Sequence, residues 1–336
     1  MNPLIYADNN ATTAVAPEAL AAMLPYLKEE YFNPSSLYDP AARVSKALKK
    51  ARRETADLVG AEAANLVFTS CATESNNWAL FGAAAARPER RHILTTAVEH
   101  PAVLETCREL VRRGWEVTFL GVNRRGELNP DDYIKALRPD TLIVSIMHAN
   151  NETGVVFPIA ELARIAKETD PGILFHTDAT QSVGKLPIDL RGEFRSVDLL
   201  SFSGHKLHAP KGVGALFLRT GAAVRPLLIG GHQENGRRGG TENVPHIVAF
   251  GAACRLAREQ MPDESRIRAL RDRLETSIRE TIPHVEINGA GAERLPNTLN
   301  LAVHFIEGES ILAQLNALNI CASSGSACTS GSLEPS

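Results

Sequence analysis

The chain contains, from residue 197 to residue 206, the run Val197-Asp198-Leu199-Leu200-Ser201-Phe202-Ser203-Gly204-His205-Lys206. Its first half is mostly apolar, whereas its second half is polar and contains a glycine, which is typical of a buried strand that ends in a turn. A comparable change occurs where Ile173-Leu174-Phe175-His176-Thr177 is followed by Asp178. A lysine and an aspartate are therefore each predicted at the carboxyl end of a buried strand.

Short apolar runs of this kind alternate with helix-length amphipathic segments from about residue 65 to residue 220. The predicted strands are Asn65–Ser70, His92–Thr96, Glu116–Gly121, Thr141–Met147, Ile173–Thr177, Val197–Phe202 and Val213–Leu218. The predicted helices between them are Glu74–Ala86, Ala102–Arg113, Pro130–Leu137 and Pro158–Thr169. This alternation indicates an α/β fold with a mainly parallel, seven-stranded sheet flanked by helices.

The length of the chain favours two domains. A single core stops growing near ~250–300 residues, and the chain has 336. We predict a large domain over residues 16–255 and a smaller α+β domain formed by residues 1–15 and 256–336. The smaller domain is expected to contain strands near Glu286–Asn288 and Thr298–Val303 and a helix near Ser310–Leu318.

The composition argues against several classes of partner. A net charge of −3 gives no long-range attraction to nucleic acid or to anionic lipid. The first residues lack the features of a signal peptide, and no run approaches the ~20 apolar residues that span a bilayer. We therefore expect a cytoplasmic protein with no nucleic-acid partner and no membrane partner.

The five cysteines form neither a disulfide pattern nor a metal-binding pattern, because their number is odd and no Cys-x-x-Cys pair occurs. No metal site is predicted. Cys107 and Cys254 lie in helical patterns and are expected to be buried, and Cys321 is expected in the core of a strand. Cys328, and less strongly Cys71, have loop surroundings that suit chemistry.

Five polar clusters follow the predicted strand ends, and in a parallel sheet these ends meet at one edge, where ligands bind. The clusters are Cys71–Asn77, Glu99–His100, His148–Gly154, Asp178–Gln181 and Ser203–Lys206. Their lysine and aspartate suit pyridoxal 5'-phosphate, because the Lys206 amine can bond covalently to it and Asp178 can keep its pyridine nitrogen protonated. Lys211 is interpreted as an ordinary surface lysine.

Nine motifs, in this order along essentially the whole chain, resemble one known family. They are Asp8-Asn9-Asn10-Ala11-Thr12-Thr13, Asn33-Pro34-Ser35-Ser36, Ala72-Thr73-Glu74-Ser75-Asn76, Glu99-His100-Pro101-Ala102-Val103, His148-Ala149-Asn150-Asn151-Glu152-Thr153-Gly154, Asp178-Ala179-Thr180-Gln181-Ser182, Ser203-Gly204-His205-Lys206, Arg238-Gly239-Gly240-Thr241-Glu242-Asn243 and the loop around Cys328. The family is the NifS/IscS-like cysteine desulfurases of the pyridoxal-phosphate fold-type I (class V aminotransferase) group. The details resemble most the branch that serves nitrogenase cluster assembly.

Several residues are expected to bind the cofactor phosphate. Ala72 and Thr73 open a predicted helix after a strand, where backbone amides and the helix dipole attract an anion; the alternative for Thr73 is a plain helix cap. By resemblance, Ser203 and His205 are further phosphate ligands. Thr241 resembles the threonine that reaches the phosphate of the neighbouring subunit, which implies a homodimer with shared sites.

The resemblance also implies roles around the cofactor ring. Gln181 is expected to hydrogen-bond the phenolic oxygen, and His100 to stack on the ring and exchange protons with the substrate. Asn151, rather than Asn150, is expected near the cofactor and the substrate.

Cys328 lies in a loop of small residues, Ser323-Ser324-Gly325-Ser326-Ala327-Cys328-Thr329-Ser330-Gly331-Ser332, which favours mobility. The resemblance implies that its thiolate takes the sulfur of L-cysteine as a persulfide and leaves L-alanine. An iron–sulfur scaffold protein would then receive the sulfur, and the nitrogenase-associated branch links this supply to nitrogen fixation. A buried structural thiol or a metal ligand are the alternative interpretations of Cys328.

Two other kinds of function stay open at this point. One is a different fold-type I reaction, such as selenocysteine lysis or transamination, although a transaminase has no need of a thiol in a loop. The other is a non-catalytic docking subunit of a cluster-assembly complex. In the family, the arginine that binds the substrate carboxylate lies beyond the position of Ser336, and Arg237 or Arg238 are the candidates to replace it.

Overall fold

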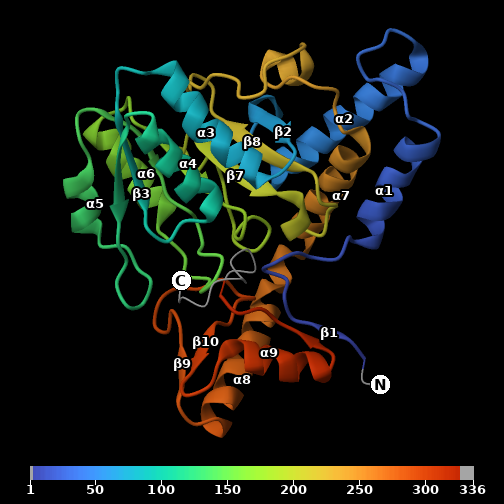
Figure 1. Cartoon of the computed structure of the whole chain (residues 1–336). Coiled ribbons are helices and arrows are strands. Elements are labelled where there is room, and N and C mark those ends of the chain that lie inside the picture. The colour runs from blue at the N-terminus through green and yellow to red at the C-terminus, as the bar shows by residue number, and fades with distance from the viewer. Residues whose placement is uncertain (1–2, 326–336) are drawn as a thin grey trace.

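A computed structural model describes residues 3–325. It contains a seven-stranded sheet with helices on both faces and two small two-stranded sheets below it in the view of Figure 1. The helices are α1 (Pro17–Lys28), α2 (Asp39–Leu58), α3 (Ala72–Ala86), α4 (Pro101–Arg112), α5 (Pro130–Ala136), α6 (Ile159–Thr169), α7 (Val244–Gln260), α8 (Glu264–Thr281) and α9 (Gly308–Ala317). The strands are β1 (Ile5–Tyr6), β2 (Leu66–Thr69), β3 (His92–Thr96), β4 (Glu116–Leu120), β5 (Thr141–Ser145), β6 (Leu174–Asp178), β7 (Leu199–Ser203), β8 (Gly214–Leu218), β9 (Val285–Ile287), β10 (Leu301–Val303) and β11 (Ile320–Cys321).

The large sheet has the strand order β2-β8-β7-β6-β5-β3-β4. Strand β8 runs antiparallel to both of its neighbours, and the pairs from β7 to β4 are all parallel. The predicted α/β fold with a mainly parallel, seven-stranded sheet is therefore confirmed. Its parallel strands place their carboxyl ends at one edge, so the polar clusters that follow these strands meet there, as predicted.

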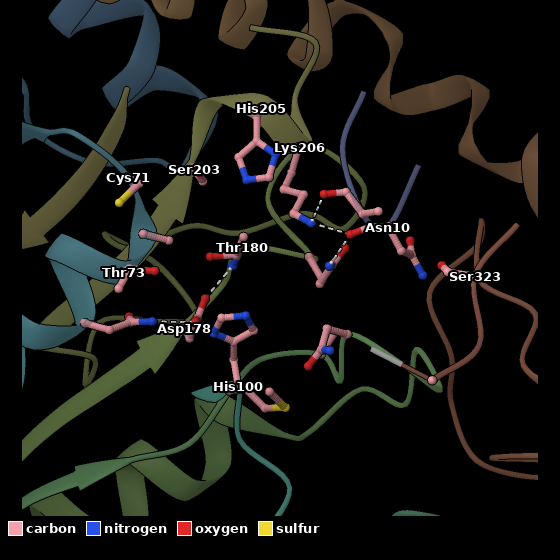
Figure 2. Close-up of a pocket in the computed structure, with 18 residues that line it drawn as sticks. Asn10, Cys71, Thr73, His100, Asp178, Thr180, Ser203, His205, Lys206 and Ser323 are labelled. Atoms are coloured by element: carbon pink, nitrogen blue, oxygen red, sulfur yellow. Dashed lines mark hydrogen bonds between the residues drawn. The ribbon is translucent and has the colours of Figure 1, made fainter. Parts of the chain in front are cut away.

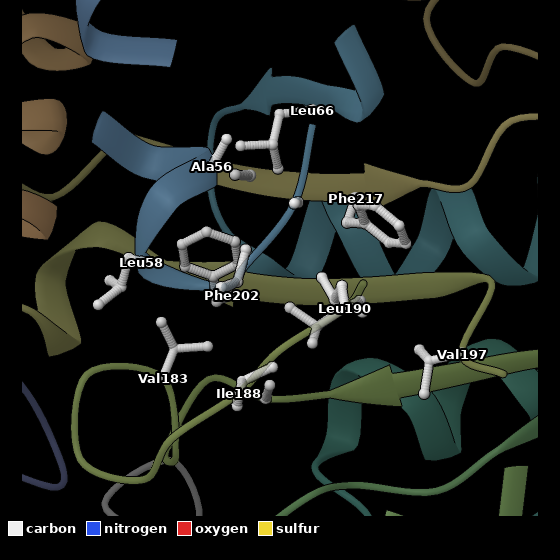
Figure 3. Close-up of a cluster of buried hydrophobic side chains, with 14 of the residues drawn as sticks. Ala56, Leu58, Leu66, Val183, Ile188, Leu190, Val197, Phe202 and Phe217 are labelled. Carbon is white, nitrogen blue, oxygen red and sulfur yellow. The ribbon is translucent and has the colours of Figure 1, made fainter. Parts of the chain in front are cut away.

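Successive residues of each central strand face opposite sides of the sheet, because side chains alternate along a strand. Leu216 of β8 joins a cluster with Trp78 of α3 and with α4, whereas the next residue, Phe217, joins a larger cluster on the other face. Figure 3 shows part of that second cluster, in which Phe202 and Phe217 lie with Leu58 from the end of α2. Burial on both faces explains why the sequences of these strands are nearly continuous apolar runs.

Helices α1 and α2 both pack against α7 beside the sheet (Figure 1). A Cβ atom at Gly251 of α7 would lie 2.6 Å from the Cα of Ala51 in α2. This crossing is too close for any residue but glycine. The α1–α7 and α2–α7 contacts thereby join α7 to the N-terminal helices, although these helices are distant from it in sequence.

The two small sheets join segments from opposite ends of the chain. Strand β1 pairs in parallel with β11, so that Ile5 lies opposite Ile320 and Tyr6 opposite Cys321. Strands β9 and β10 form an antiparallel pair. The elements expected in the smaller domain are thus present close to their predicted positions, while the boundaries 16–255 and 1–15 with 256–336 stay a prediction.

The structure places the cysteines partly as predicted. Cys107 of α4 and Cys254 of α7 are buried in helices, as expected. Cys321 does lie in a strand, but its expected core position is wrong: it is partly exposed, because β11 has only the short β1 beside it. In the part of the chain from residue 3 to residue 325, every helix is too short or too polar to cross a membrane.

Candidate active site

One cavity lies at the carboxyl ends of the parallel strands (Figure 2). Nine of the ten predicted cofactor-binding residues line it, namely Ala72, Thr73, His100, Asn151, Asp178, Gln181, Ser203, His205 and Lys206. They come from the ends of β2, β3, β5, β6 and β7, or from the turns that follow. The fold therefore brings together residues that are more than a hundred positions apart.

Lys206 ends the short 3-10 helix Gly204–Lys206, which directly follows β7. Its Nζ donates hydrogen bonds to the carbonyl oxygens of Asn10 and, at 2.7 Å, of Ala11. Figure 2 shows these two bonds at the side of the cavity opposite Asp178. The amine is thus inside the cavity and is held against the N-terminal segment.

Asp178 is the last residue of β6 and is buried. Its Oδ1 accepts a hydrogen bond from the backbone amide of Thr180 at 2.9 Å, and its Oδ2 accepts one from Nδ2 of Asn76 at 2.6 Å. Both donors are uncharged amides. A protonated pyridine nitrogen would supply the cation that a buried carboxylate needs, so this site suits the nitrogen of the proposed cofactor.

The environment favours neutral imidazoles at His100 and His205. Burial, assisted by the charge of Lys206, lowers the pKa of His100 against the opposing effect of Asp178. At the start of α4, Nδ1 of His100 accepts a hydrogen bond from the amide of Ala102 at 3.1 Å, which leaves the proton on Nε2. Burial also lowers the pKa of His205 to about 4. A neutral His100 ring can stack on an aromatic cofactor, and its Nε2 carries a proton that it can donate.

The phosphate end of the cavity is built around the first turn of α3. Cys71 is the N-terminal capping residue, so the alternative interpretation of Thr73 as the cap is wrong. Ser203 Oγ and Thr180 Oγ1 are buried and have no hydrogen-bond partner among the described residues. Hydroxyl groups in need of a partner, beside a helix N-terminus, fit an anionic phosphate group. The residues of this cavity therefore fit pyridoxal 5'-phosphate.

Asn150 and Asn151 have different positions. Asn150 stabilises a turn, because its Oδ1 accepts hydrogen bonds from the backbone amides of Glu152 and Thr153. Asn151 lines the cavity. The structure thus agrees with the choice of Asn151 as the residue near the cofactor, and its role there stays a prediction.

Thr241 and Lys211 do not line this cavity. Thr241 lines a second, separate cavity together with Tyr26 of α1 and Phe32. Lys211 is exposed, as expected of a surface lysine. Cys328 lies outside the described residues.

Cys71 lines the cavity beside the first turn of α3, and its Sγ is 3.6 Å from Oγ of Ser70. Within residues 3–325, no group of three or more His, Cys, Asp or Glu side chains is arranged to bind a metal ion.

The cavity is also lined by residues that were given no individual role from the sequence. They are Asn10, Ala11, Asn76, Met147, Ala149, Thr180, Ser323 and Gly325. Asn76 had a signal, since it lies in the polar cluster Cys71–Asn77, about one helical turn after Ala72, the first residue of α3. Asn10 and Ala11 lie in the first of the nine motifs, but their contact with Lys206 was not predictable, because it is made by backbone carbonyls that every residue type possesses.

The chain is similar to proteins of known family. The sequence model of the family described as "Aminotransferase class-V" matches residues 5–335. The protein named "Cysteine desulfurase 2" of Trichormus variabilis is 54% identical over 333 residues, which cover 99% of this chain and 83% of that protein. "Cysteine desulfurase NifS" of Azotobacter vinelandii is 53% identical over 334 residues, with 99% and 82% covered. A solved structure titled "NIFS-LIKE PROTEIN" superposes with a TM-score of 0.91 at 38% identity, covering 95% of this chain and 87% of the other.

Proposed function

The chain belongs to the aminotransferase class-V family, and we propose that it is a pyridoxal 5'-phosphate-dependent cysteine desulfurase that supplies sulfur for iron–sulfur cluster assembly. The observation that carries this proposal is the cavity itself, in which Lys206, Asp178 and His100 converge beside an anion-binding helix N-terminus. The names of the similar proteins indicate the same reaction.

The cofactor supplies an aldehyde that bonds to amines and a ring that withdraws electrons when its nitrogen is protonated. Asp178 would hold that nitrogen, since its carboxylate is fixed at the end of β6 by Asn76 and Thr180. Lys206 would bind the aldehyde and, after L-cysteine replaces it there, would carry the α-proton of the substrate. His100 would stack on the ring.

Cys328 is proposed as the residue that receives sulfur. Its thiolate attacks the sulfur of bound L-cysteine, so that a sulfur–sulfur bond forms while the carbon–sulfur bond of the substrate breaks. The three-carbon fragment is then protonated and leaves as L-alanine. The persulfide passes to an iron–sulfur scaffold protein, and in a nitrogen-fixing cell that scaffold would serve nitrogenase.

The site has further requirements that we include in the proposal. A sulfur-carrying thiol needs a reducing compartment, which favours the cytoplasm. Thr241 is outside the cavity of its own chain, so we propose that it reaches the phosphate of a second copy in a homodimer. His205, Ser203 and Thr73 would bind the phosphate in the cavity of their own chain.

The test compares Lys206→Ala with Lys211→Ala, a matched change of an exposed lysine five residues later. We expect the unaltered protein and Lys211→Ala to show the visible absorbance of lysine-bound cofactor and to form L-alanine from L-cysteine, and Lys206→Ala to lose both. Borohydride reduction and peptide mapping should label Lys206. A label on Lys211, or a colourless unaltered protein after incubation with the cofactor, would contradict the proposal.

A further inference from the structure

Asn10 lies at the junction of three parts of the chain that are distant in sequence. Its backbone carbonyl accepts hydrogen bonds from Lys206 Nζ and, at 3.1 Å, from Gln181 Nε2. Its side-chain amide contacts two residues that precede β10, donating from Nδ2 to Thr298 Oγ1 at 3.0 Å and accepting at Oδ1 from Asn297 Nδ2 at 3.0 Å. One residue therefore links two cofactor-facing side chains to the C-terminal region.

The partners of the Asn10 side chain are themselves firmly held. Thr298 is buried, and its carbonyl accepts a hydrogen bond from Arg271. A Cβ atom at Gly154 would lie 2.7 Å from the Cβ of Thr298, so the loop after β5 packs directly on this threonine. Thr298 cannot move without displacing these neighbours.

The turn that contains Asn10 is also attached on both sides and through the Asn10 carbonyl, which accepts a hydrogen bond from Gln181. Before it, β1 pairs with β11. After it, the Thr13 amide donates to the carbonyl of His205 at 3.0 Å. In the middle of the turn, the side chain of Asn10 adds contacts to Asn297 and to the buried Thr298, and so it helps to fix where the two carbonyls that hold Lys206 lie.

A lysine that carries a proton during the reaction has to be held near the substrate while it is not bonded to the cofactor. Carbonyl oxygens that accept from its Nζ do this, and misplacing a catalytic group by about 1 Å can cost about 100-fold in rate. We propose that Asn10 is a positioning residue for the Lys206 amine: its side chain, bound to Asn297 and Thr298, holds the carbonyls of residues 10 and 11 where they place that amine during proton transfer. This inference rests on the proposed role of Lys206.

The experiment uses the cofactor-loaded enzyme with Asn10→Ala, Thr298→Val and the double variant, and Asn9→Ala as the control from the same turn, where the side chain is exposed. We expect kcat per bound cofactor to fall about 10- to 100-fold in both single variants, with KM changed less than about twofold. The double variant should be no slower than Asn10→Ala, because both substitutions remove the same hydrogen bond, the one between Asn10 and Thr298. The deuterium isotope effect with α-deuterated L-cysteine should rise, since proton transfer becomes slower. Asn9→Ala should resemble the unaltered enzyme.

A purely structural role predicts something different. It would lower the fraction of cofactor-loaded protein but leave kcat per bound cofactor and the isotope effect unchanged, and that result overturns the inference while the proposed function stands. Thr298→Val, which keeps the shape of the buried side chain, provides the same readout if Asn10→Ala does not fold. If the turnover of L-cysteine by the unaltered enzyme does not depend on Lys206, both the proposed function and the inference about Asn10 are overturned.

Discussion

Glu99 is a carboxyl group that burial keeps from ionising at neutral pH. It lies next to His100, and its Oε1 accepts hydrogen bonds from Thr96 Oγ1 at 2.7 Å and from the Met147 amide at 2.9 Å. Burial raises the pKa of Glu99 from 4.5 to about 8, and the negative charge of Asp178 acts in the same direction. A protonated carboxyl group therefore lies next in sequence to His100, which lines the cavity.

The raised pKa of Glu99 makes the stability of the protein depend on pH. In the unfolded chain this carboxyl group ionises near 4.5, so its contribution is fully present below that pH and is lost as the pH rises towards about 8. Glu99→Gln keeps an acceptor oxygen but does not titrate. Urea unfolding at pH 5, 6.5 and 8 should show a smaller loss of stability with rising pH in the variant. Parallel pH dependences in the two proteins would show that Glu99 is already ionised in the folded state.

Cys328→Ser separates sulfur transfer from cofactor binding. A hydroxyl group cannot carry persulfide sulfur, so we expect the variant to keep the visible absorbance and its change on adding L-cysteine, yet to lose alanine and sulfide formation. Cys321→Ser, a change of the partly exposed thiol in β11, is the matched control and should remain active. Normal alanine formation by Cys328→Ser would identify another sulfur acceptor.

At the scale of elements, the first turn of α3 is tied to the glycine-rich segment that precedes Thr241. Glu74 accepts a hydrogen bond from the Ser70 amide at 2.7 Å and pairs with Arg238 at 2.9 Å. Burial alone would raise the pKa of Glu74, but the hydrogen bonds from Arg238 and Ser70 outweigh it and lower the pKa. A negative charge thus lies close to the proposed phosphate site and is neutralised there by one arginine.

Arg238→Met should leave the Glu74 carboxylate unpaired beside this site. We expect the affinity for pyridoxal 5'-phosphate to fall about tenfold and the free energy of unfolding to fall by about 1–3 kcal/mol. The double variant Arg238→Met/Glu74→Gln should recover part of both losses, since no charge is then left unpaired. Equal losses in the single and double variants, measured by cofactor titration and urea unfolding, would show that the charge of Glu74 does not matter.

Elements were more predictable from the sequence than contacts. All seven strands of the large sheet appear within a few residues of their predicted positions. Burial on both faces gives every one of them except the edge strand β4 a short buried run between turns. Strand-end positions also identified Lys206 and Asp178, since the local pattern places them. Asn10 was missed, because its contacts join segments whose proximity only the folded chain reveals. Cys321 was misjudged for a related reason: the pattern Leu318-Asn319-Ile320 predicts a strand but not how few neighbours it has.

At the scale of the whole molecule, the surroundings of Thr241 resemble a surface that another chain covers. Tyr31 and Leu37, in the connection between α1 and α2, are 72% and 103% exposed. Tyr31 lines the same cavity as Thr241. Exposed aromatic and aliphatic side chains of this kind are typical of subunit interfaces.

Co-expression of Lys206→Ala with Thr241→Ala tests the shared site. If Thr241 acts on the neighbouring subunit, a mixed dimer contains one site with both residues intact, and the other site lacks both. At limiting cofactor, the co-expressed sample should be more active than the mean of the two variants prepared separately. Activity equal to that mean would place Thr241 and Lys206 in the same site of one chain.

The pairing of β1 with β11 also sets the order of events while the protein is being made. A ribosome adds ~5–20 residues per second, so Ile5 and Tyr6 wait roughly 15–60 s before Ile320 and Cys321 have been synthesised. The large sheet is complete in sequence by Leu218, long before then. In this interval the nascent chain can hold a folded sheet while β1 has no partner strand and the side chain of Asn10 has not yet met Asn297 and Thr298. The turn that holds Lys206 is therefore fixed only after residues 297–321 have been made.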